Sequence, residues 1–420
     1  MLYHAYEVTH ALLHPWHRAA SVGEMILDHP DNLLRETWTG RNLLASLRML
    51  GQLTRRYDKP QFAIDGTRIF GLPVPVETQV MLSKPFCDLL HFDRDERVCG
   101  KRYDPKVLIV APMSGHYATL LRGTVQAMIQ EHNTYITDWK DAREVPITAG
   151  RFDLDDFIDY VVDFIRFLGE NTHVIAVCQP SVPVLAATAL MAEAGDPCTP
   201  VSLTLMGGPI DTRRNPTQVN EHAQSHDLAW FRRNVISTVP FPNPGFLRSV
   251  YPGFLQLSGF MAMNLDRHVD AYRDYYLDLV KGDADSVQQH HKFYDEYLAV
   301  MDLTAEFFLQ TLHTVFHEQA LAKGTLHHRG RRVDCAAITG TALLTVEGEN
   351  DDICGVGQTS AAHELCPNVP GADRYHYLQP SVGHYGVFNG TRWRTEIQPR
   401  VREMIRTTAF KRRLHPADAA

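Results

Sequence analysis

Short apolar runs alternate with helical segments in the middle of the chain, and this alternation constrains the fold more than any other feature. The runs are VLIVA at 107–111, TYIT at 134–137, HVIAV at 173–177 and VSLTL at 201–205. Each precedes a turn, and strands covered on both faces have this continuous apolar pattern. Strands alternating with helices at this spacing imply right-handed crossovers and a mainly parallel sheet. The sequence therefore predicts an α/β fold.

The rest of the predicted sheet lies at both ends of this region. The β-rich runs between residues 76 and 93 indicate an antiparallel hairpin at a sheet edge. Apolar strand patterns return at 342–346 and 375–378, and a helix from 393 to 405 closes the sheet.

A long helical segment separates the two groups of strands. After Asp211 the sequence is helical, aromatic and rich in histidine for over a hundred residues, without buried-strand runs. We predict one α/β-hydrolase core interrupted by a helical lid. The core comprises residues 1–211 and 336–420, with an N-terminal extension over 1–70, and the lid comprises residues 212–335.

Charge and cysteine content exclude several classes of protein. The net charge is -8, and Lys and Arg are scattered, which argues against nucleic-acid binding. The seven cysteines are odd in number and lack metal-binding spacing, so we expect free thiols in a reducing compartment and no metal or organic cofactor. The N-terminus lacks a signal-peptide pattern, and no apolar stretch is long enough to span a membrane. These features predict a cytoplasmic protein without a membrane span.

Cys178 follows a buried strand directly and precedes a helix. This is the context of a nucleophile elbow, usually Gly-x-Ser-x-Gly, in which a tight turn exposes the nucleophile. Here Ala176 replaces the first glycine and Pro180 the second, and proline is tolerated in the first turn of a helix. The alternative for Cys178 alone is an inert core thiol.

Two further strand ends supply partners for this cysteine. His384 lies in a glycine-flanked loop after the last apolar strand, and Asp351 follows the strand before it. The order nucleophile, acid, histidine is that of α/β hydrolases, so we predict a Cys178-Asp351-His384 triad. Asp352 is the alternative acid, and either aspartate could instead cap a helix.

A predicted oxyanion hole completes the site. Backbone N–H groups must face the charge that develops on the attacked carbonyl oxygen. We expect one from Gln179, after the nucleophile, and one from Met113, in the turn after the strand at 107–111. The alternative is a plain strand-to-helix turn capped by Ser114.

Seven phrases resemble intracellular polyhydroxyalkanoate depolymerases. The similarity runs from the first residues to the C-terminal helix. The phrases are APMSGHYATLLR at 111–122, YITDW at 135–139, VCQP at 177–180, MGGPID at 206–211, YPGFL at 251–255, VEGENDD at 346–352 and GHYG at 383–386.

The resemblance implies a cytoplasmic hydrolase of stored poly(3-hydroxybutyrate) that attacks amorphous granules through an acyl-cysteine. Its Cys-Asp-His triad corresponds to Cys178, Asp351 and His384. An enzyme acting on an apolar polyester needs an apolar contact surface. We predict substrate contacts from Ser114, His116, Tyr251, Phe254 and Met261; the alternative for the lid residues among them is lid core, where such residues are more often found.

Three other functions remain open from the sequence. A polyhydroxyalkanoate synthase has the same fold and triad, but its elbow is Gly-x-Cys-x-Gly, which Ala176 and Pro180 do not match. A thioesterase is the second alternative. A non-catalytic granule-coating protein is the third, and the complete triad argues against it.

Overall fold

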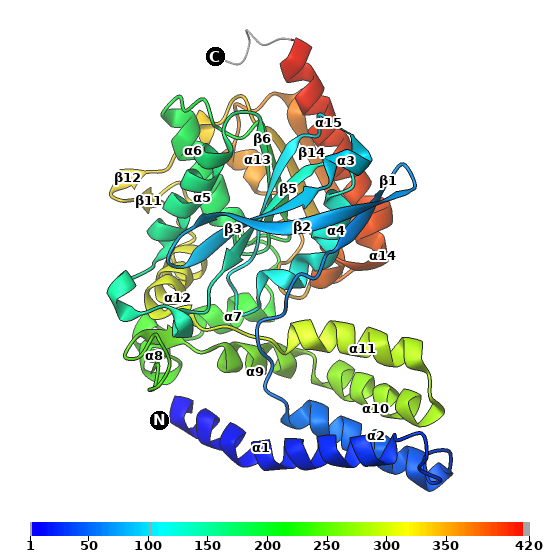
Figure 1. Ribbon diagram of the computed structural model, residues 1–420. Coiled ribbons are helices and arrows are strands. Elements are labelled where there is room, and N and C mark those ends of the chain that lie inside the picture. The colour runs from blue at the N-terminus through cyan, green and yellow to red at the C-terminus, as the bar shows by residue number, and fades with distance from the viewer. Residues whose placement is uncertain (1, 101, 415–420) are drawn as a thin grey trace.

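The computed structural model describes residues 2–100 and 102–414, and a nine-stranded sheet forms its centre (Figure 1). Its strands are β1 Gly66–Ile69, β2 Leu72–Ser83, β3 Cys87–Arg94, β4 Lys106–Val110, β5 Asn133–Trp139, β6 Thr172–Val177, β7 Ser202–Met206, β13 Ala342–Gly348 and β14 Arg374–Gln379. They are arranged in the order β1-β2-β3-β5-β4-β6-β7-β13-β14. The first three strands pair antiparallel, β3 pairs antiparallel with β5, and all pairs from β5 to β14 are parallel.

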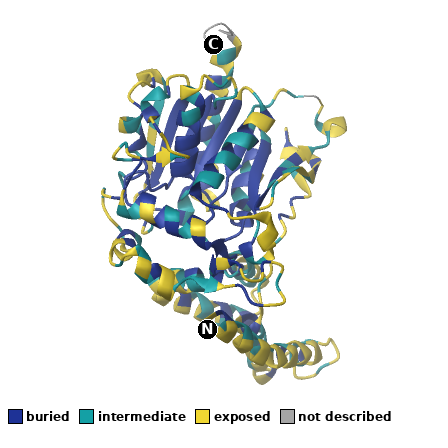
Figure 2. Cartoon of the chain, turned by 90° about the vertical axis from the view of Figure 1, so that its left-hand side faces the viewer, coloured by how far each residue is buried: buried dark blue, intermediate teal, exposed yellow. Residues whose placement is uncertain are grey.

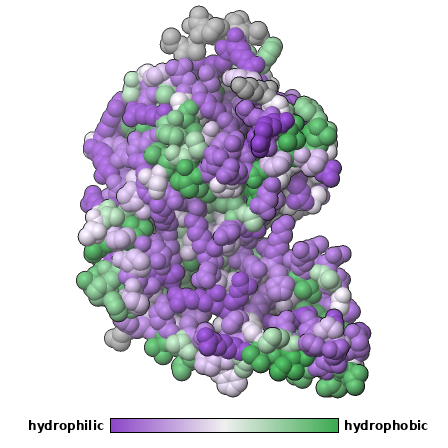
Figure 3. Space-filling view, in the orientation of Figure 1, coloured by the Kyte–Doolittle hydropathy of each residue, from purple (hydrophilic) through white to green (hydrophobic). Residues whose placement is uncertain are grey.

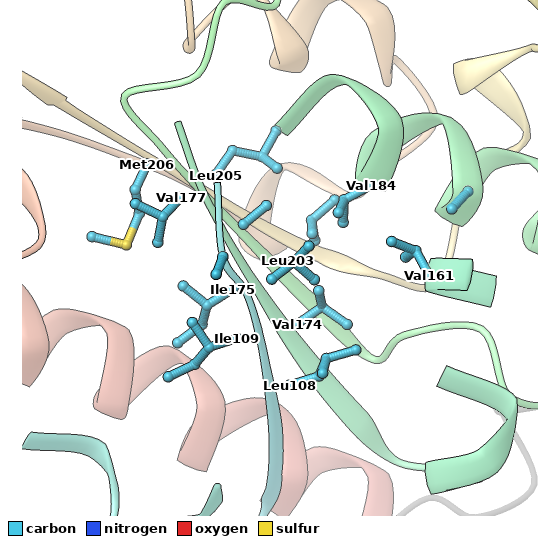
Figure 4. Packing of buried hydrophobic residues seen from close by; sticks show 14 of the residues in the cluster. Leu108, Ile109, Val161, Val174, Ile175, Val177, Val184, Leu203, Leu205 and Met206 are labelled. Atoms are coloured by element: carbon cyan, nitrogen blue, oxygen red, sulfur yellow. The ribbon is translucent and has the colours of Figure 1, made fainter. Parts of the chain in front are cut away.

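Burial on both faces explains the continuous apolar runs. Every residue of β6, β7 and β13 is buried. Alternate side chains point to opposite faces, with Ile109 and Ile175 on one side and Leu108 and Val174 on the other (Figure 4). Strand β2 lies near the sheet edge, and many of its residues are exposed. The predicted edge hairpin therefore corresponds to β2 and β3.

Helices cover both faces of the sheet (Figure 1). Helices α5 (Leu154–Leu168) and α6 (Ser181–Glu193) lie on one side, and α4 (Arg122–Met128), α14 (Gly390–Arg392) and α15 (Gln398–Leu414) lie on the other. Helix α6 is apolar all round because it is buried almost completely. This sheet order, with parallel strands joined through helices, is the α/β-hydrolase fold, so the predicted fold class is confirmed.

The segment between β7 and β13 is mainly helical. It contains α7 Gln218–Gln224, α8 Leu228–Asn234, α9 Gly253–Met263, α10 Leu265–Lys281, α11 Ala284–Tyr297 and α12 Ala305–Thr311. It also contains a small sheet of β8 Ser237–Thr238, β9 Ser249–Tyr251 and β10 Leu303–Thr304, and a hairpin of β11 His327–His328 and β12 Arg331–Arg332. Strands this short leave no apolar run in the sequence, which explains why none was predicted there.

The N-terminal helices pack on this insertion. Helices α1 (Leu2–Leu27) and α2 (Trp38–Thr54) lie side by side, and α2 contacts α10 (Figure 1). The Tyr276 hydroxyl donates to Asn42 Oδ1 at 3.0 Å across that contact. The division into core and lid stays a prediction, but the helical pair of residues 2–54 associates with the insertion through α2 and α10.

Helices α1 and α2 and the segment between them carry exposed apolar side chains. Leu12, Trp16, Met25, Leu33 and Trp38 are all exposed. Figure 2 shows much of this end of the molecule as exposed while the sheet is buried, and Figure 3 shows hydrophobic patches at the same end. In the described part of the chain, no helix has both the length and the apolar character needed to cross a membrane.

A buried carboxyl group joins the N-terminal helix, the insertion and the core. Asp302 accepts hydrogen bonds from the Tyr3 hydroxyl at 2.7 Å and from the Gly253 N–H at 2.9 Å. Its own N–H donates to Asp141 Oδ1 at 3.1 Å, and its carbonyl oxygen accepts from the Ala142 N–H at 3.0 Å. Three segments far apart in sequence therefore meet at one residue.

We expect this carboxyl group to make stability depend on pH. Burial, and then the charge of Asp141, raises the pKa of Asp302 from 3.8 to about 7, although Arg143 acts in the opposite direction. Because the folded protein then binds more protons than the unfolded chain between these pH values, this contribution to stability is lost as pH rises from about 4 to about 7.

The substitution Asp302→Asn removes the titrating group while keeping its shape. The difference in unfolding free energy between variant and wild type is expected to shift in favour of the variant as pH rises, by up to about 1.4 kcal/mol per pH unit. Urea unfolding at pH 5, 6, 7 and 8 measures it. If the difference in unfolding free energy between Asp302→Asn and wild type stayed constant from pH 5 to pH 8, Asp302 would not have the raised pKa.

Candidate active site

Cys178 lies in the sharp turn between β6 and α6. Its φ is +67°, a left-handed conformation that is uncommon for residues other than glycine. The turn is held on both sides, because the Cys178 N–H donates to the Met206 carbonyl at 2.7 Å and the Ser181 N–H donates to the Cys178 carbonyl at 3.0 Å. A strained backbone held in this way is typical of nucleophile elbows. The half-buried Cys178 faces a cavity.

His384 and Asp351 form a buried pair beside this turn. His384 begins the turn after β14, and Asp351 lies in the loop after β13. The Nδ1 of His384 is 2.8 Å from Asp351 Oδ2. The other oxygen, Oδ1, accepts from the N–H groups of Ile353 at 2.9 Å and Cys354 at 2.8 Å. These bonds fix the carboxylate, which in turn orients the imidazole.

The neighbouring aspartate points elsewhere. Asp352 Oδ2 accepts a hydrogen bond from the Asn264 side chain at 2.9 Å. Asn264 lies between α9 and α10, so Asp352 ties the loop after β13 to the insertion. Of the two candidate acids, the structure brings Asp351 to His384.

The surroundings of His384 favour its protonated form. Burial by itself lowers the pKa of His384, because it penalises the charged imidazolium. The Asp351 carboxylate and the neighbouring Cys178 act in the opposite direction and outweigh burial, so the pKa lies well above its usual value. An imidazolium stabilised in this way is the natural partner of a cysteine thiolate.

The two backbone N–H groups predicted for the oxyanion hole are free to bind a ligand. Within residues 2–100 and 102–414, neither the Met113 N–H nor the Gln179 N–H has a hydrogen-bond partner. The loop that carries Met113 is held by the insertion, because the Gly115 carbonyl accepts from the Met301 N–H at 2.7 Å. Gly115 has a φ of +100°, which glycine adopts without strain.

Two glycines after β7 allow the close packing of these elements. A Cβ atom on Gly207 would lie 3.2 Å from His384 Cε1. A Cβ atom on Gly208 would overlap Ser181 Oγ and would lie 3.0 Å from the Cys178 carbonyl oxygen. The MGGP sequence therefore lets the end of β7 approach both the elbow and the histidine.

We expect Gly208→Ala to reduce stability and activity together. The added methyl group overlaps Ser181 at the start of α6, and overpacking of this kind costs roughly 1–3 kcal/mol. Displacement of the elbow should also lower kcat/KM at least about tenfold, since small misplacements at a site have large kinetic effects. Thermal unfolding and ester hydrolysis measure the two effects.

Gly371→Ala is the matched control, since a Cβ there meets nothing within 4 Å. Its stability should stay within about 0.5 kcal/mol of wild type. If Gly208→Ala and Gly371→Ala lost equal amounts of stability and activity, the packing explanation would be contradicted.

A cavity of about 570 Å³ opens in front of Cys178. Its lining is mainly apolar, and most of it comes from the insertion. Among the predicted contact residues, Ser114, His116 and Tyr251 line it. His116 is buried, bonds the Tyr297 carbonyl through Nε2 at 3.1 Å, and has its pKa lowered to about 4 by burial. His116 is therefore neutral near pH 7 and already partnered.

Phe254 and Met261 do not line the cavity. They are seven residues apart in α9 and so share one face of the helix, whereas Gln256, Gly259 and Met263 lie on the other face and do line it. Phe254 stacks on Tyr6 of α1, with ring centroids 4.1 Å apart. Residue type alone does not give the phase of a helix, so the sequence could not show that these two residues lie away from the cavity, and their contact with substrate stays a prediction.

Several cavity residues were missed by the sequence-based prediction. Tyr385 adjoins His384 in the glycine-flanked loop, and that adjacency was the one signal available for it. The others are aromatic residues of separate elements that no local pattern connects. They are Phe231, Phe307, Phe308, Phe316 and Phe388.

The described residues contain no group of three or more His, Cys, Asp or Glu side chains suited to a metal ion. The seven cysteines are free thiols.

Comparison with known proteins gives one family match. Residues 207–409 match the family described as PHB de-polymerase C-terminus, where PHB is poly(3-hydroxybutyrate). No curated protein sequence matches the chain.

Solved structures of hydrolases resemble the chain at low sequence identity. A monoglyceride lipase variant from Saccharomyces cerevisiae is 11% identical, with a TM-score of 0.45, covering 79% of this chain and 96% of that one. A 2-hydroxy-6-oxo-6-phenylhexa-2,4-dienoate hydrolase from Rhodococcus sp. strain RHA1 is 11% identical, with a TM-score of 0.42, over 79% and 99%. A thermophilic esterase from Thermogutta terrifontis is 11% identical, with a TM-score of 0.40, over 82% and 97%.

Proposed function

Residues 207–409 of this chain carry the C-terminal domain of the PHB depolymerase family, and from this premise we propose that the protein hydrolyses stored poly(3-hydroxybutyrate) or a related polyester. The domain match and the α/β-hydrolase fold support an ester hydrolase. The cysteine nucleophile, the polyester substrate and a place in the cytoplasm on polymer granules are our proposal.

One observation carries the proposal above all others. His384, which pairs with Asp351, lines the same apolar cavity as Cys178 on its strained turn. A nucleophile, a base and an orienting carboxylate gathered at one cavity are the constellation required for acyl transfer.

In the first half of the reaction, Cys178 attacks the ester carbonyl. The Cys178 thiol gives its proton to His384, and the sulfur forms a bond to the carbonyl carbon. The N–H groups of Met113 and Gln179 donate to the resulting oxyanion. When the C–O bond of the ester breaks, His384 returns the proton to the leaving alkoxide. The product is an acyl-cysteine and a shortened chain with a new hydroxyl end.

In the second half, water replaces the cysteine. His384 removes a proton from water, the hydroxide attacks the thioester carbonyl, and the sulfur leaves and takes the proton back. In the acyl-enzyme the sulfur no longer carries negative charge, so its part in raising the pKa of His384 is lost. The histidine then becomes a better base for water at the stage that needs one.

The cavity suits an uncharged polyester. Its volume lies in the range that encloses drug-sized ligands, which are comparable to several hydroxyacid units. Among the described residues its lining has no Lys or Arg. The phosphates of coenzyme A would find no cation there, which favours polyester hydrolysis over the synthase and thioesterase reactions.

Amorphous poly(3-hydroxybutyrate) granules provide the direct test. We expect the protein to release soluble 3-hydroxybutyrate or its oligomers in proportion to its concentration. The parallel assay supplies 3-hydroxybutyryl-coenzyme A and measures both polymer growth and free coenzyme A. Polymer growth would identify a synthase, release of coenzyme A alone a thioesterase, and inactivity in every assay would sink the proposal.

A further inference from the structure

Helix α1 presents apolar side chains to solvent. Val8, Leu12 and Trp16 are 58%, 68% and 62% exposed, and their spacing of four residues places them on one face of the helix, the apolar face of α1. Among the exposed positions of this 26-residue helix, the only Lys, Arg, Asp or Glu is Arg18. A surface helix normally turns its charged side to water, so this face has the composition of an interaction surface.

The acidic residues of α1 point toward the protein instead. Glu7 accepts two hydrogen bonds from Arg56, both at 3.0 Å, and Glu24 accepts one from Arg48 at 2.9 Å. Both arginines belong to α2 or to the residues just after it. These ion pairs hold α1 in its orientation, so the apolar face stays turned to solvent.

Helix α1 is also close to the active-site cavity (Figure 1). Tyr6 of α1 stacks on Phe254 of α9, with ring centroids 4.1 Å apart. The other face of α9 carries Gln256 and Met263, which line the cavity. A surface bound at the apolar face of α1 is therefore separated from the cavity by the thickness of α1 and α9.

The charge of this region selects among apolar partners. Helices that bind anionic membranes have a polar side rich in Lys and Arg. Residues 2–54 contain no lysine, and Arg35, Arg41 and Arg48 are each paired with a carboxylate. A polyester is uncharged and insoluble in water, so binding to it needs apolar contact and no cations. The surface of such a polymer matches this face in both polarity and charge.

We propose that the apolar face of α1 binds the surface of the polyester granule and holds the enzyme there while the cavity takes up polymer. This inference rests on the proposed function and adds a binding surface outside the active site. In this arrangement α1 contributes to binding of the solid and not to hydrolysis of a bound ester. Solid and soluble substrates should therefore respond differently to changes in α1.

A triple variant tests this difference. Val8→Gln, Leu12→Gln and Trp16→Gln together make the face polar with a residue that suits a helix. In the Cys178→Ala background, where granules should stay intact, we expect cosedimentation with amorphous poly(3-hydroxybutyrate) granules to weaken at least about tenfold. Without the Cys178 substitution, release of 3-hydroxybutyrate from dilute granules should fall to a similar extent. The value of kcat/KM on a soluble linear trimer of 3-hydroxybutyrate should stay within about twofold of wild type.

Leu72→Gln, Val80→Gln and Phe410→Gln together form the matched control. These residues are 58%, 58% and 62% exposed, but they lie on β2 and α15 of the core, away from α1 (Figure 1). The control variant should bind granules and hydrolyse both substrates as wild type does.

Equal granule binding by wild type and the α1 variant would overturn the inference, as would an equal loss of binding in the control. Equal losses of activity on the trimer and on granules would also overturn it. A wild-type dimer that dissociates in the α1 variant, measured by sedimentation velocity, would assign the face to a second copy of the chain. Binding to phosphatidylcholine–phosphatidylglycerol vesicles as tight as binding to granules would assign it to a lipid surface.

These outcomes leave the proposed function intact as long as wild type hydrolyses the trimer or the granules. Absence of hydrolysis of both substrates by wild type would overturn the proposed function, whether or not the protein binds granules.

Discussion

Replacing Cys178 with alanine is expected to lower kcat/KM for ester hydrolysis by about four orders of magnitude or more. The thiol is the only side chain of the protein that bonds to the acyl carbon in the proposed reaction. Removing it leaves the N–H groups of Met113 and Gln179 and the cavity, which alone give slow catalysis. Release of 3-hydroxybutyrate from amorphous granules, and hydrolysis of a soluble trimer, measure the effect.

The fold of this variant should be unchanged. Cys178 is half-buried at the edge of a cavity, so alanine creates little new empty space. The positive φ disfavours alanine no more than cysteine, since both have a Cβ. Circular dichroism and thermal unfolding should match wild type.

Cys198→Ala is the control for loss of a thiol. Cys198 is also half-buried, but it lies after α6 and does not line the cavity. We expect activity within about a factor of two of wild type, as for ordinary substitutions away from a site. If Cys178→Ala retained a tenth of wild-type activity, Cys178 would not be the nucleophile.

Asp351→Asn should have the second largest effect, a loss of about three to four orders of magnitude in kcat. Asp351 Oδ2 holds the Nδ1 of His384 at 2.8 Å, and an asparagine there removes the charge and can favour the wrong tautomer. Because Asp351 contributes to the raised pKa of His384, that pKa should fall in the variant. NMR titration of the histidine ring measures the shift, and single-turnover kinetics measure the rate.

The adjacent residue supplies a closely matched control. Asp352→Asn makes the same chemical change one position further along, where the carboxylate bonds to Asn264 instead. We expect activity within about threefold of wild type and a small loss of stability, as for surface polar contacts. Equal losses of activity in Asp351→Asn and Asp352→Asn would mean that the loss of one negative charge, and not the loss of the contact with His384, lowers the activity.

The sequence by itself predicted the parallel sheet and the positions of its strands. Residues 174–177 are apolar without interruption and residues 342–346 are apolar except for Thr345, and the structure places both in fully buried strands. Such runs follow from local chemistry, because a strand covered on both faces has no polar side. The ends of those strands then located Cys178 and His384, since a parallel sheet gathers its strand ends at one edge.

Only the tertiary structure shows which of Asp351 and Asp352 contacts His384. The two residues are chemically identical neighbours, so composition and spacing treat them alike. The direction of each side chain depends on the loop after β13, in which two N–H groups bind Asp351 Oδ1 and Asn264 binds Asp352.

The cavity also depended on tertiary structure. The sequence showed that the insertion is rich in aromatic residues, but it did not show which of them face Cys178. Phe254 and Met261 lie on the face of α9 opposite the cavity, with Phe254 against α1, while Phe308 and Phe388 reach the cavity from elements far apart in the chain.

Local pattern thus determined the sheet and the strand ends that carry the proposed triad, because hydrophobic periodicity is a property of neighbouring residues. Which aspartate contacts His384 and which side chains line the cavity appeared only in the folded chain. They depend on the direction in which side chains from distant segments point, and no pattern within one segment encodes that direction.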